Sequence, residues 1–400
     1  MPIAILALAL GTFGIGTTEF VIMGMLPNVA GDLGVDVPTA GGYVSSYALG
    51  VVVGAPLLTA ASVRLPRRWT LVGLLVLFTV GNLLSAFAPT HEALLATRFL
   101  TGLPHGAFFG VGVLVAASLV TPDRRGRAMA TVVVGLTLAN VVGVPAGTFI
   151  AQQAGWRWTF AAVALVGAVA AVAVAVLAPR RDDGAGTGSL RAELSAFARP
   201  QVLLTLAVVV FGLGGLFASY SYVAPMLTDV SGFAESAVPW VLIVVGIGMT
   251  AGSYTGGWLA DRSTLGTLAG GLALVVVSLV ALAAFLDNAA AAVALLFVLG
   301  FGSLGAGPAI QMRIIEQAGG APTMVSAGVQ SAFNIANTIG AWLGGAVIAA
   351  GAGLRAPNLV GAGLALVGLL LLGCSAVLEV RQRRAAAAVT AQPQPVAVAA

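Results

Sequence analysis

The chain has 400 residues, of which 59% are hydrophobic and only 8% are charged. A water-soluble domain carries about 25% charged residues, so lipid is the solvent that fits this composition. The net charge of +4 comes from arginine alone. The absence of lysine excludes a Walker-type phosphate loop, and the scattered arginines argue against nucleic-acid binding.

Twelve apolar segments are long enough to cross a bilayer, because a spanning helix needs about 20 mostly apolar residues. The first segment lacks the positively charged start of a cleaved signal, so we expect it to be retained as a span. The sequence therefore predicts an all-α membrane protein. The predicted spans are 4–27, 41–63, 69–88, 93–117, 128–151, 158–179, 202–227, 238–260, 265–286, 289–311, 323–350 and 357–379.

A polar, glycine-rich stretch at 180–200 divides the chain. It is typical of a linker and predicts an N-terminal six-helix bundle at 1–179 and a C-terminal one at 201–384. Residues 385–400 are rich in Ala, Pro and Gln, which predicts a disordered tail. Of the eighteen arginines, fifteen fall in the segments on the same side of the membrane as the N-terminus, two fall in loops on the opposite side, and one lies within a span. This bias predicts that both termini, the linker and the tail are cytoplasmic.

The two halves resemble each other at an offset of 198 residues, and segment 139–143 matches 336–340 at an offset of 197. Such a repeat predicts two pseudo-symmetric bundles with a substrate site between them near the midplane. The alternative is chance similarity between two apolar strings. The matched pairs are Pro27 with Pro225, Gly54 with Gly252, Arg64 with Arg262, and Gly102 with Gly300.

Glu19 is the one acidic residue of fourteen that lies well inside a predicted span. An ionised carboxylate costs about 2.5–3.5 kcal/mol or more at the bilayer centre, and such residues usually handle protons or ions. We therefore expect Glu19 to be the proton-coupling group. The alternative is a solvated carboxylate near the outer membrane surface, although the residue lies roughly 24 Å along its helix, beyond the midplane.

Arg98 is the second charge inside a span, and a guanidinium there must find carbonyl groups or an anion. It is assigned to proton coupling with Glu19; the alternative is a purely structural arginine. His105 follows two turns later and is a candidate for the substrate cavity, against the alternative of a packing histidine. With two histidines and one cysteine, a zinc site is not expected. Protons are the only coupling agent predicted, with no cofactor.

Further residues are predicted to line a substrate cavity, to form a tight helix contact or to act as a latch between conformations. Aromatic side chains suit an apolar drug site, although each can also belong to the core or face lipid. Small residues permit close helix contact and proline bends a helix. A charge pair at the turn after the eighth span is a candidate latch; the alternative is a solvated loop pair. The cavity candidates are Phe108, Asn140, Phe217, Tyr220 and Asn337; the others are Gly143, Pro145, Gly147, Asp261 and Arg262.

Several motifs carry a family resemblance. Segment 252–262 (GSYTGGWLADR) resembles the loop motif of the major facilitator superfamily, and 98–102 (RFLTG) resembles the helix-four motif of its drug:proton antiporter branch. Segment 135–147, with Gly143, Pro145 and Gly147, resembles the antiporter motif. Segments 16–20, 102–109, 155–157 and 220–225 are similar to bacterial chloramphenicol-efflux and arabinose-efflux-like permeases. The loop at 63–68 (VRLPRR) departs from the family pattern, because the usual acid is missing.

The resemblance implies the major facilitator fold and proton-driven export of a small amphipathic drug by alternating access, with chloramphenicol-like compounds first. It also implies a monomer in a bacterial cell membrane that binds lipid and a small-molecule substrate, and no enzymatic activity. The nearest alternative is an exporter of a sugar, nucleoside or other metabolite. A transport-inactive sensor or assembly subunit is another. A membrane enzyme is the third, although the sequence lacks a nucleotide loop, metal cluster or nucleophile–base pair.

Overall fold

The computed structural model describes residues 2–62, 65–178, 199–318 and 322–390, and every regular element in these ranges is a helix. The first half contains α1 (Ile3–Gly24), α2 (Leu26–Leu33), α3 (Val37–Ala40), α4 (Gly42–Ser62), α5 (Arg67–Ala86), α6 (His91–Ser118), η1 (Pro122–Arg124), α7 (Arg125–Leu138), η2 (Ala139–Gly143), α8 (Val144–Ala154) and α9 (Trp156–Leu177). The second contains α11 (Pro200–Tyr220), α12 (Val223–Pro225), η3 (Met226–Val230), η4 (Glu235–Ala237), α13 (Val238–Ala260), α14 (Thr264–Phe285), α15 (Ala289–Gly305), α16 (Gly307–Ala318), α17 (Pro322–Val347), η5 (Ile348–Ala352) and α18 (Ala356–Thr390).

Twelve helices within the described ranges are long and apolar enough to cross a membrane, which confirms the predicted number of spans. The seventh ends at Tyr220 rather than at 227. Pro225 explains the early end, because a proline cannot donate to the carbonyl four residues before it and its ring clashes there. Pro27, its repeat partner, follows a similar break after Gly24.

The tenth span continues to Gln317 rather than ending at 311, so it includes Arg313. The prediction that counted Arg313 among the fifteen arginines outside the spans is therefore wrong. Arg313 is only 3% exposed, and its guanidinium donates to Glu379 Oε2 at 3.2 Å and to Ser375 Oγ at 2.8 Å. These bonds to α18 offset the cost of burying the charge, so the helix does not have to end before it.

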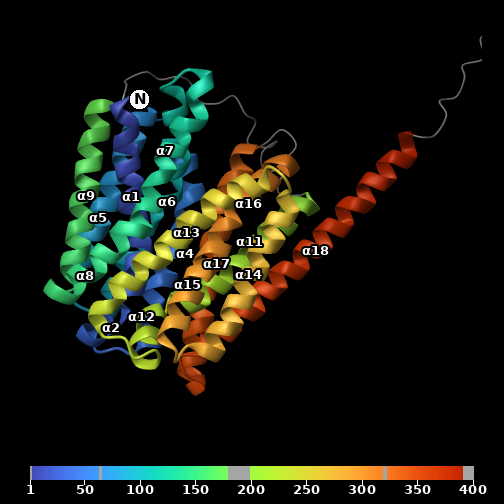
Figure 1. The fold of residues 1–400 in the computed structure, drawn as a ribbon. Helices are drawn as coiled ribbons and strands as arrows, with labels where there is room; N and C mark the ends of the chain where they lie inside the picture. Colours follow the sequence, from blue (N-terminus) through green and yellow to red (C-terminus); the bar gives the residue numbers. More distant parts are fainter. Residues whose placement is uncertain (1, 63–64, 179–198, 319–321, 391–400) are drawn as a thin grey trace, which may run out of the picture.

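The last helix, α18, continues through Thr390, six residues past the predicted end of the bundle. Residues 385–388 are all alanine, the strongest helix former, and this explains the extension. The predicted linker lies almost wholly outside the described residues, as do 63–64 of the first-half loop motif and the last ten residues of the predicted tail. Figure 1 shows that α1 begins and α18 ends on the same side of the molecule. We call this the terminal side and the opposite one the far side.

Glycines give the two halves equivalent helix contacts. A side chain on any of six glycines would crowd or overlap a backbone oxygen of the neighbouring helix, so only glycine lets these helices approach so closely. Three contacts join α4 to α6, and the same three join α13 to α15 at an offset of 198 residues. The first set is Gly50 with Phe99, Gly54 with Leu103, and Gly102 with Tyr47; the second is Gly248 with Phe297, Gly252 with Phe301, and Gly300 with Val245.

The two bundles meet where α4 packs on α17 and where α13 packs on η2 and α8. In the far half of the molecule, Ser45 Oγ donates to Thr338 O at 3.2 Å and Gln152 Nε2 donates to Glu235 O at 2.7 Å. On the same side, an ion pair between Asp32 of α2 and Arg157 at the start of α9 holds these two helices together. Hydrogen bonds from Arg157 and Trp156 hold the pKa of Asp32 below its ordinary value.

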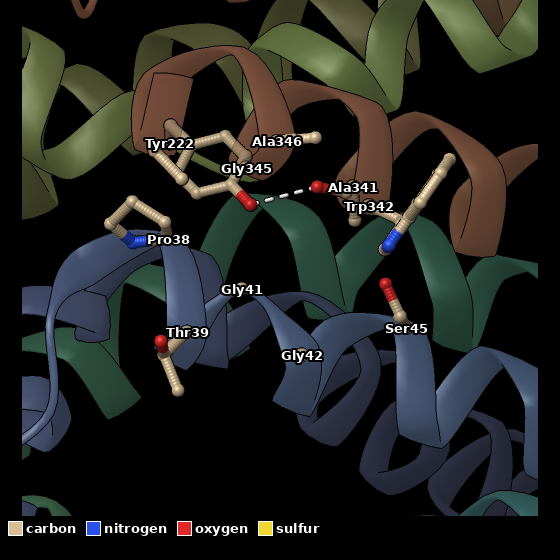
Figure 2. A pocket seen from close by; sticks show the side chains of 11 residues that line it. Pro38, Thr39, Gly41, Gly42, Ser45, Tyr222, Ala341, Trp342, Gly345 and Ala346 are labelled. Atoms are coloured by element: carbon tan, nitrogen blue, oxygen red, sulfur yellow. Dashed lines mark hydrogen bonds between the residues drawn. The ribbon is translucent and has the colours of Figure 1, made fainter. Parts of the chain in front are cut away.

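Tyr222 completes this far-side contact. Its hydroxyl donates to Ala341 O at 2.7 Å, and the ring lies between Gly41 of the first bundle and Gly345 of the second (Figure 2). A groove of about 310 Å³ lies along this junction, lined by α3, α4 and α17. Any side chain at Gly41 or Gly345 would overlap the Tyr222 hydroxyl. The bundles are therefore held together by close packing in the far half.

Candidate functional site

The residues of interest lie where the bundles meet at mid-height, and we call this region the central seam. It comprises residues from four spans of the first bundle and two of the second. They are Thr18, Glu19 and Phe20 of α1, Tyr47 of α4, Arg98 and His105 of α6, Asn140 of η2, Phe217 of α11, and Gln330, Phe333, Asn334 and Asn337 of α17.

Glu19 is buried in the central seam. Its residue is 2% exposed, and its Oε1 has no hydrogen-bond partner among the described residues. An unpaired buried carboxylate is costly, so the site requires a proton, a ligand or water for part of the time. Depth and the missing partner are the properties expected of a group that exchanges protons.

Arg98 is fully buried and is held by the backbone. Its Nη1 donates to Thr18 O at 3.0 Å and to Thr18 Oγ1 at 3.2 Å, and its Nε donates to Tyr43 O at 3.4 Å. The guanidinium also stacks over the ring of Tyr47, 4.5 Å from the ring centroid. Its Nη2 has no partner in the described part of the chain. The arginine thus connects α1, α4 and α6, and its Nη2 remains available as a hydrogen-bond donor.

Glu19 and Arg98 do not form an ion pair in the described ranges, but their charges interact. The contact between them passes through the backbone, because Arg98 binds the residue that directly precedes Glu19. Thr18 Oγ1 in turn donates to Asn82 Oδ1 at 2.7 Å. The sequence analysis missed Thr18 and Asn82, although the position of Thr18 beside the buried acid could have suggested the first.

His105 joins the two bundles. Its Nδ1 lies 3.1 Å from the Tyr47 hydroxyl, and its Nε2 lies 3.2 Å from Gln330 Nε2. The ring also contacts Phe109, with centroids 5.2 Å apart. Because an amide nitrogen only donates, His105 Nε2 accepts from Gln330, and the neutral ring donates from Nδ1 to the Tyr47 hydroxyl. The bond to Gln330 joins the two bundles near mid-height. The sequence analysis did not find Tyr47 or Gln330.

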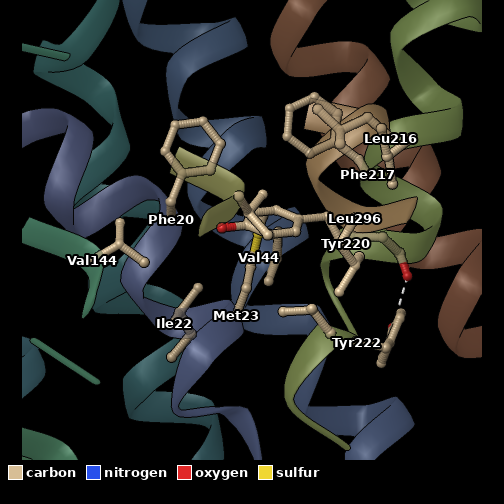
Figure 3. Close-up of a cluster of buried hydrophobic side chains, with 14 of the residues drawn as sticks. Phe20, Ile22, Met23, Val44, Val144, Leu216, Phe217, Tyr220, Tyr222 and Leu296 are labelled. Carbon is tan, nitrogen blue, oxygen red and sulfur yellow. Dashed lines mark hydrogen bonds between the residues drawn. The ribbon is translucent and has the colours of Figure 1, made fainter. Parts of the chain in front are cut away.

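Aromatic rings bridge the seam beside Glu19. Phe20 of the first bundle stacks on Phe217 of the second, with centroids 6.4 Å apart (Figure 3). Phe217 also makes an edge-to-face contact with Phe333, with centroids 5.0 Å apart. Tyr220 is buried in the same hydrophobic cluster. Phe108 is placed elsewhere, in the separate hydrophobic cluster inside the first bundle, where it packs on Gly11.

The predicted antiporter motif forms a tight contact between the fifth span and α1. Gly143 packs on Thr17, and Gly147 packs on Val21. Pro145 follows a π-helical turn, η2, which includes Asn140. A proline disturbs the preceding helical turn, and π-turns are frequent at functional sites. Asn140 Oδ1 is buried without a partner in the described ranges.

Asn337, the repeat counterpart of Asn140, lies on a regular α-helix. Both of its amide atoms are buried without a hydrogen-bond partner among the described residues, and so is Oδ1 of Asn334 one turn before it. The sequence analysis missed Asn334, although polar residues at intervals of three and four in an apolar span could have revealed a common face.

Asp261 and Arg262 lie at the terminal-side end of α13, away from the central seam. Asp261 is exposed and forms no ion pair within the described part of the chain, while the Arg262 guanidinium stacks on Trp258, 3.4 Å from the ring centroid.

No group of three or more His, Cys, Asp or Glu residues that could hold a metal occurs among the described residues. The central seam thus offers a buried acid, a fixed cation, aromatic rings and neutral amides.

Comparisons with known proteins agree with this architecture. A sequence profile of the Major Facilitator Superfamily matches residues 8–327. The chain is 43% identical over 372 residues to the inner membrane transport protein YdhP of Escherichia coli (strain K12), covering 93% of this chain and 95% of that protein. It is 36% identical over 343 residues to the chloramphenicol resistance protein of Streptomyces lividans, covering 85% and 88%.

The fold is also similar to a solved structure, a bacterial homologue of the human lysosomal transporter Spinster in an inward-facing and unoccupied conformation. The TM-score is 0.70 at 16% identity, and the alignment covers 94% of this chain and 95% of the other. At this identity the similarity concerns the fold alone. It confirms the predicted fold class.

Proposed function

The chain belongs to the Major Facilitator Superfamily, as its motifs predicted, and on that basis we propose that it exports small amphipathic molecules in exchange for protons. It is a multi-pass membrane protein of a transporter family. We place it in a bacterial cell membrane with both termini in the cytoplasm, in accordance with the arginine bias of its loops.

One observation carries the proposal of proton coupling: the buried Oε1 of Glu19 lacks a hydrogen-bond partner among the described residues, and the residue lies beside both the aromatic bridge and Arg98. A substrate in the seam would compete with a proton for the same space and charge balance. With Glu19 ionised, Arg98 balances the charge; with Glu19 protonated, that balance is lost. The two states of Glu19 therefore differ in their affinity for substrate, which is the requirement for coupling.

The transport cycle follows from this competition. With the far side closed, a substrate reaches the seam from the terminal side while Glu19 gives up its proton. The bundles then rock, the far-side contacts around Tyr222 open, and a proton from outside returns to Glu19 as the substrate leaves. A membrane potential of 100 mV supplies about 2.3 kcal/mol for each charge moved.

A chloramphenicol-like compound is the first substrate class to test. The name of the Streptomyces lividans relative supports it, and so does the combination of aromatic rings with neutral amides at the seam. Export of a sugar or nucleoside is the second candidate, because carboxamides also bind hydroxyl groups.

The test uses inside-out membrane vesicles energised with a proton gradient and placed in a medium that contains one member of a panel of antibiotics, sugars and nucleosides. We expect chloramphenicol accumulation by the wild type that collapses when the gradient is dissipated. Glu19→Gln keeps the size of the side chain but cannot ionise, so this variant should lose gradient-driven accumulation.

Glu316→Gln serves as the control, since Glu316 is an exposed acid at the terminal-side end of α16. It should pump at the rate of the wild type. Gradient-driven accumulation by Glu19→Gln at the wild-type rate would overturn the proposal of coupling through Glu19.

A further inference from the structure

The side of α17 that faces the first bundle carries a line of carboxamides. Gln330, Asn334 and Asn337 follow one another at intervals of four and three residues, so they share one face of the helix. Gln330 reaches His105 of α6 at 3.2 Å, which shows that this face points toward the first bundle. We call these three residues the carboxamide stripe.

Packing on either side confirms this direction. Gly340 and Gly344 of α17 lie against the backbone of α11, and the carbonyl of Thr338 accepts a hydrogen bond from Ser45 of α4. The carboxamide stripe lies between the face that packs on α11 and the face that packs on α4. It is therefore enclosed by protein and does not face lipid, in agreement with the full burial of Asn334 and Asn337.

The amide atoms of the stripe are incompletely satisfied. Asn334 Nδ2 donates to Gln330 O at 3.0 Å, but Asn334 Oδ1 and both amide atoms of Asn337 have no partner among the described residues. Leaving buried amides unpaired costs stability, so such groups need an explanation. A bound molecule with hydroxyl or amide groups would supply the missing donors and acceptors.

The surroundings define what kind of molecule fits. Phe333 precedes Asn334 and meets the ring of Phe217, which places an aromatic surface beside the stripe. Carboxamides carry no net charge and bind neutral donors and acceptors equally well. Asn140, at the equivalent position of the first bundle, offers another unpartnered Oδ1.

We propose that the carboxamide stripe is the specificity-determining subsite of this transporter and that it selects uncharged molecules that combine an aromatic ring with hydroxyl or amide groups over permanent cations. The proposal rests on the proposed export function and adds the charge class of the substrate to it. Glu19 is then coupled to the substrate through its proton and not through an ion pair, because an uncharged substrate needs no carboxylate.

The test measures equilibrium binding to purified protein in nanodiscs without a proton gradient. The two probes are chloramphenicol, an uncharged aryl diol amide, and tetraphenylphosphonium, a permanent aromatic cation. We expect saturable chloramphenicol binding by the wild type and weaker binding of the cation. Asn337→Leu and Asn334→Leu should each weaken chloramphenicol binding about fivefold for every hydrogen bond lost and leave the binding of the cation unchanged.

Thermal stability distinguishes a ligand-binding amide from a structural one. The melting temperature of ligand-free Asn337→Leu should equal or exceed that of the wild type, because the replaced amide has no hydrogen-bond partner among the described residues. Asn358→Leu is the matched control: its buried Oδ1 accepts a hydrogen bond from Ser219 at 2.6 Å, so this variant should melt earlier and still bind chloramphenicol normally.

Three results would overturn the inference: wild-type chloramphenicol affinity in Asn337→Leu, tighter binding of the cation than of chloramphenicol, or no saturable chloramphenicol binding by the wild type. None of them depends on proton coupling. Failure of the export function would instead appear in the vesicle assay of Glu19→Gln, so the two failures are distinguishable.

Discussion

Arg98 shows how a single residue makes a membrane charge tolerable. Its guanidinium is bound by two backbone carbonyls and a threonine hydroxyl and covered by aromatic rings, so the charge is never isolated in an apolar environment. The bonds to Thr18 also fix the backbone of α1 directly before Glu19. We therefore expect the position of Glu19 to depend on Arg98 through Thr18.

Replacing Arg98 by lysine tests this dependence. The charge is retained, but a point-like ammonium cannot bind Thr18 and Tyr43 together while stacking on Tyr47. Hydrogen bonds from charged groups contribute about 1.5–3 kcal/mol each. Arg98→Lys should lower the melting temperature of the purified protein and abolish gradient-driven export.

Arg355→Lys is the control, because Arg355 forms an exposed ion pair with Asp287 on the far side. Such pairs contribute about 1 kcal/mol or less, so this variant should melt like the wild type. If both variants melt alike and Arg98→Lys still transports, Arg98 does not position the α1 turn.

The sequence identified the two charged residues of the central seam but not their partners. Glu19 and Arg98 are conspicuous because charges are rare in apolar spans. Thr18, Asn82 and Tyr47 are ordinary polar residues by themselves, and their role depends on how α1, α4, α5 and α6 pack. Phe108 shows the reverse case, since an aromatic residue close to His105 in sequence points into the bundle core.

At the level of helices, the glycine contacts carry the internal symmetry. Two of the glycine pairs in the repeat, Gly54 with Gly252 and Gly102 with Gly300, were visible in the sequence. The structure explains them, since each of these glycines lies against the backbone of a neighbouring helix. The spacing of the matched residues is enough to reveal the repeat. The residues that these glycines contact can be known only from the packing of the helices. The π-turn at Asn140 was also not predictable, because its counterpart at Asn337 is regular α-helix.

Gly54→Ala tests the tight contact between α4 and α6. The added methyl group would overlap the carbonyl oxygen of Leu103, a backbone atom that cannot move aside cheaply. Overpacking of this kind costs about 1–3 kcal/mol. Gly54→Ala should therefore lower the melting temperature and the yield of folded protein.

Gly73→Ala in α5 is the matched control, because a methyl group there meets no atom within 4 Å. Alanine is favoured over glycine within a helix, so this variant should be at least as stable as the wild type. Equal melting temperatures for the two variants would contradict the prediction, because they would show that α4 and α6 can move apart without loss of stability.

For the whole molecule, the contacts between the bundles correspond to one of the two states of the proposed transport cycle. The hydrogen bond from Ser45 to Thr338 and the contact of Tyr222 with Gly41 join the bundles in the far half. Asp261, at the terminal-side end of α13, is exposed and has no ion-pair partner within the described ranges. A latch at Asp261 is expected to form only when the terminal side closes. An ion pair present in one state alone shifts the balance between the states by its own free energy.

Asp261→Asn should therefore favour the state closed on the far side. A partly buried, charge-assisted bond contributes about 1–3 kcal/mol, which corresponds to roughly a five- to 150-fold shift in the population ratio. Cysteine-accessibility probes along the seam should show more terminal-side access, and export should fall without loss of membrane expression. Unchanged access, or an equal effect of Glu316→Gln, would mean that Asp261 is only a solvated charge.

Proton release on substrate binding tests the central claim most directly. If substrate binding requires Glu19 to lose its proton, adding saturating chloramphenicol to purified protein in weakly buffered solution near neutral pH should release about one proton per bound molecule. Glu19→Gln has no carboxyl proton to give up at this position, so it should release none. Equal proton release by the wild type and Glu19→Gln would contradict the assignment of Glu19 as the group that couples export to the proton gradient.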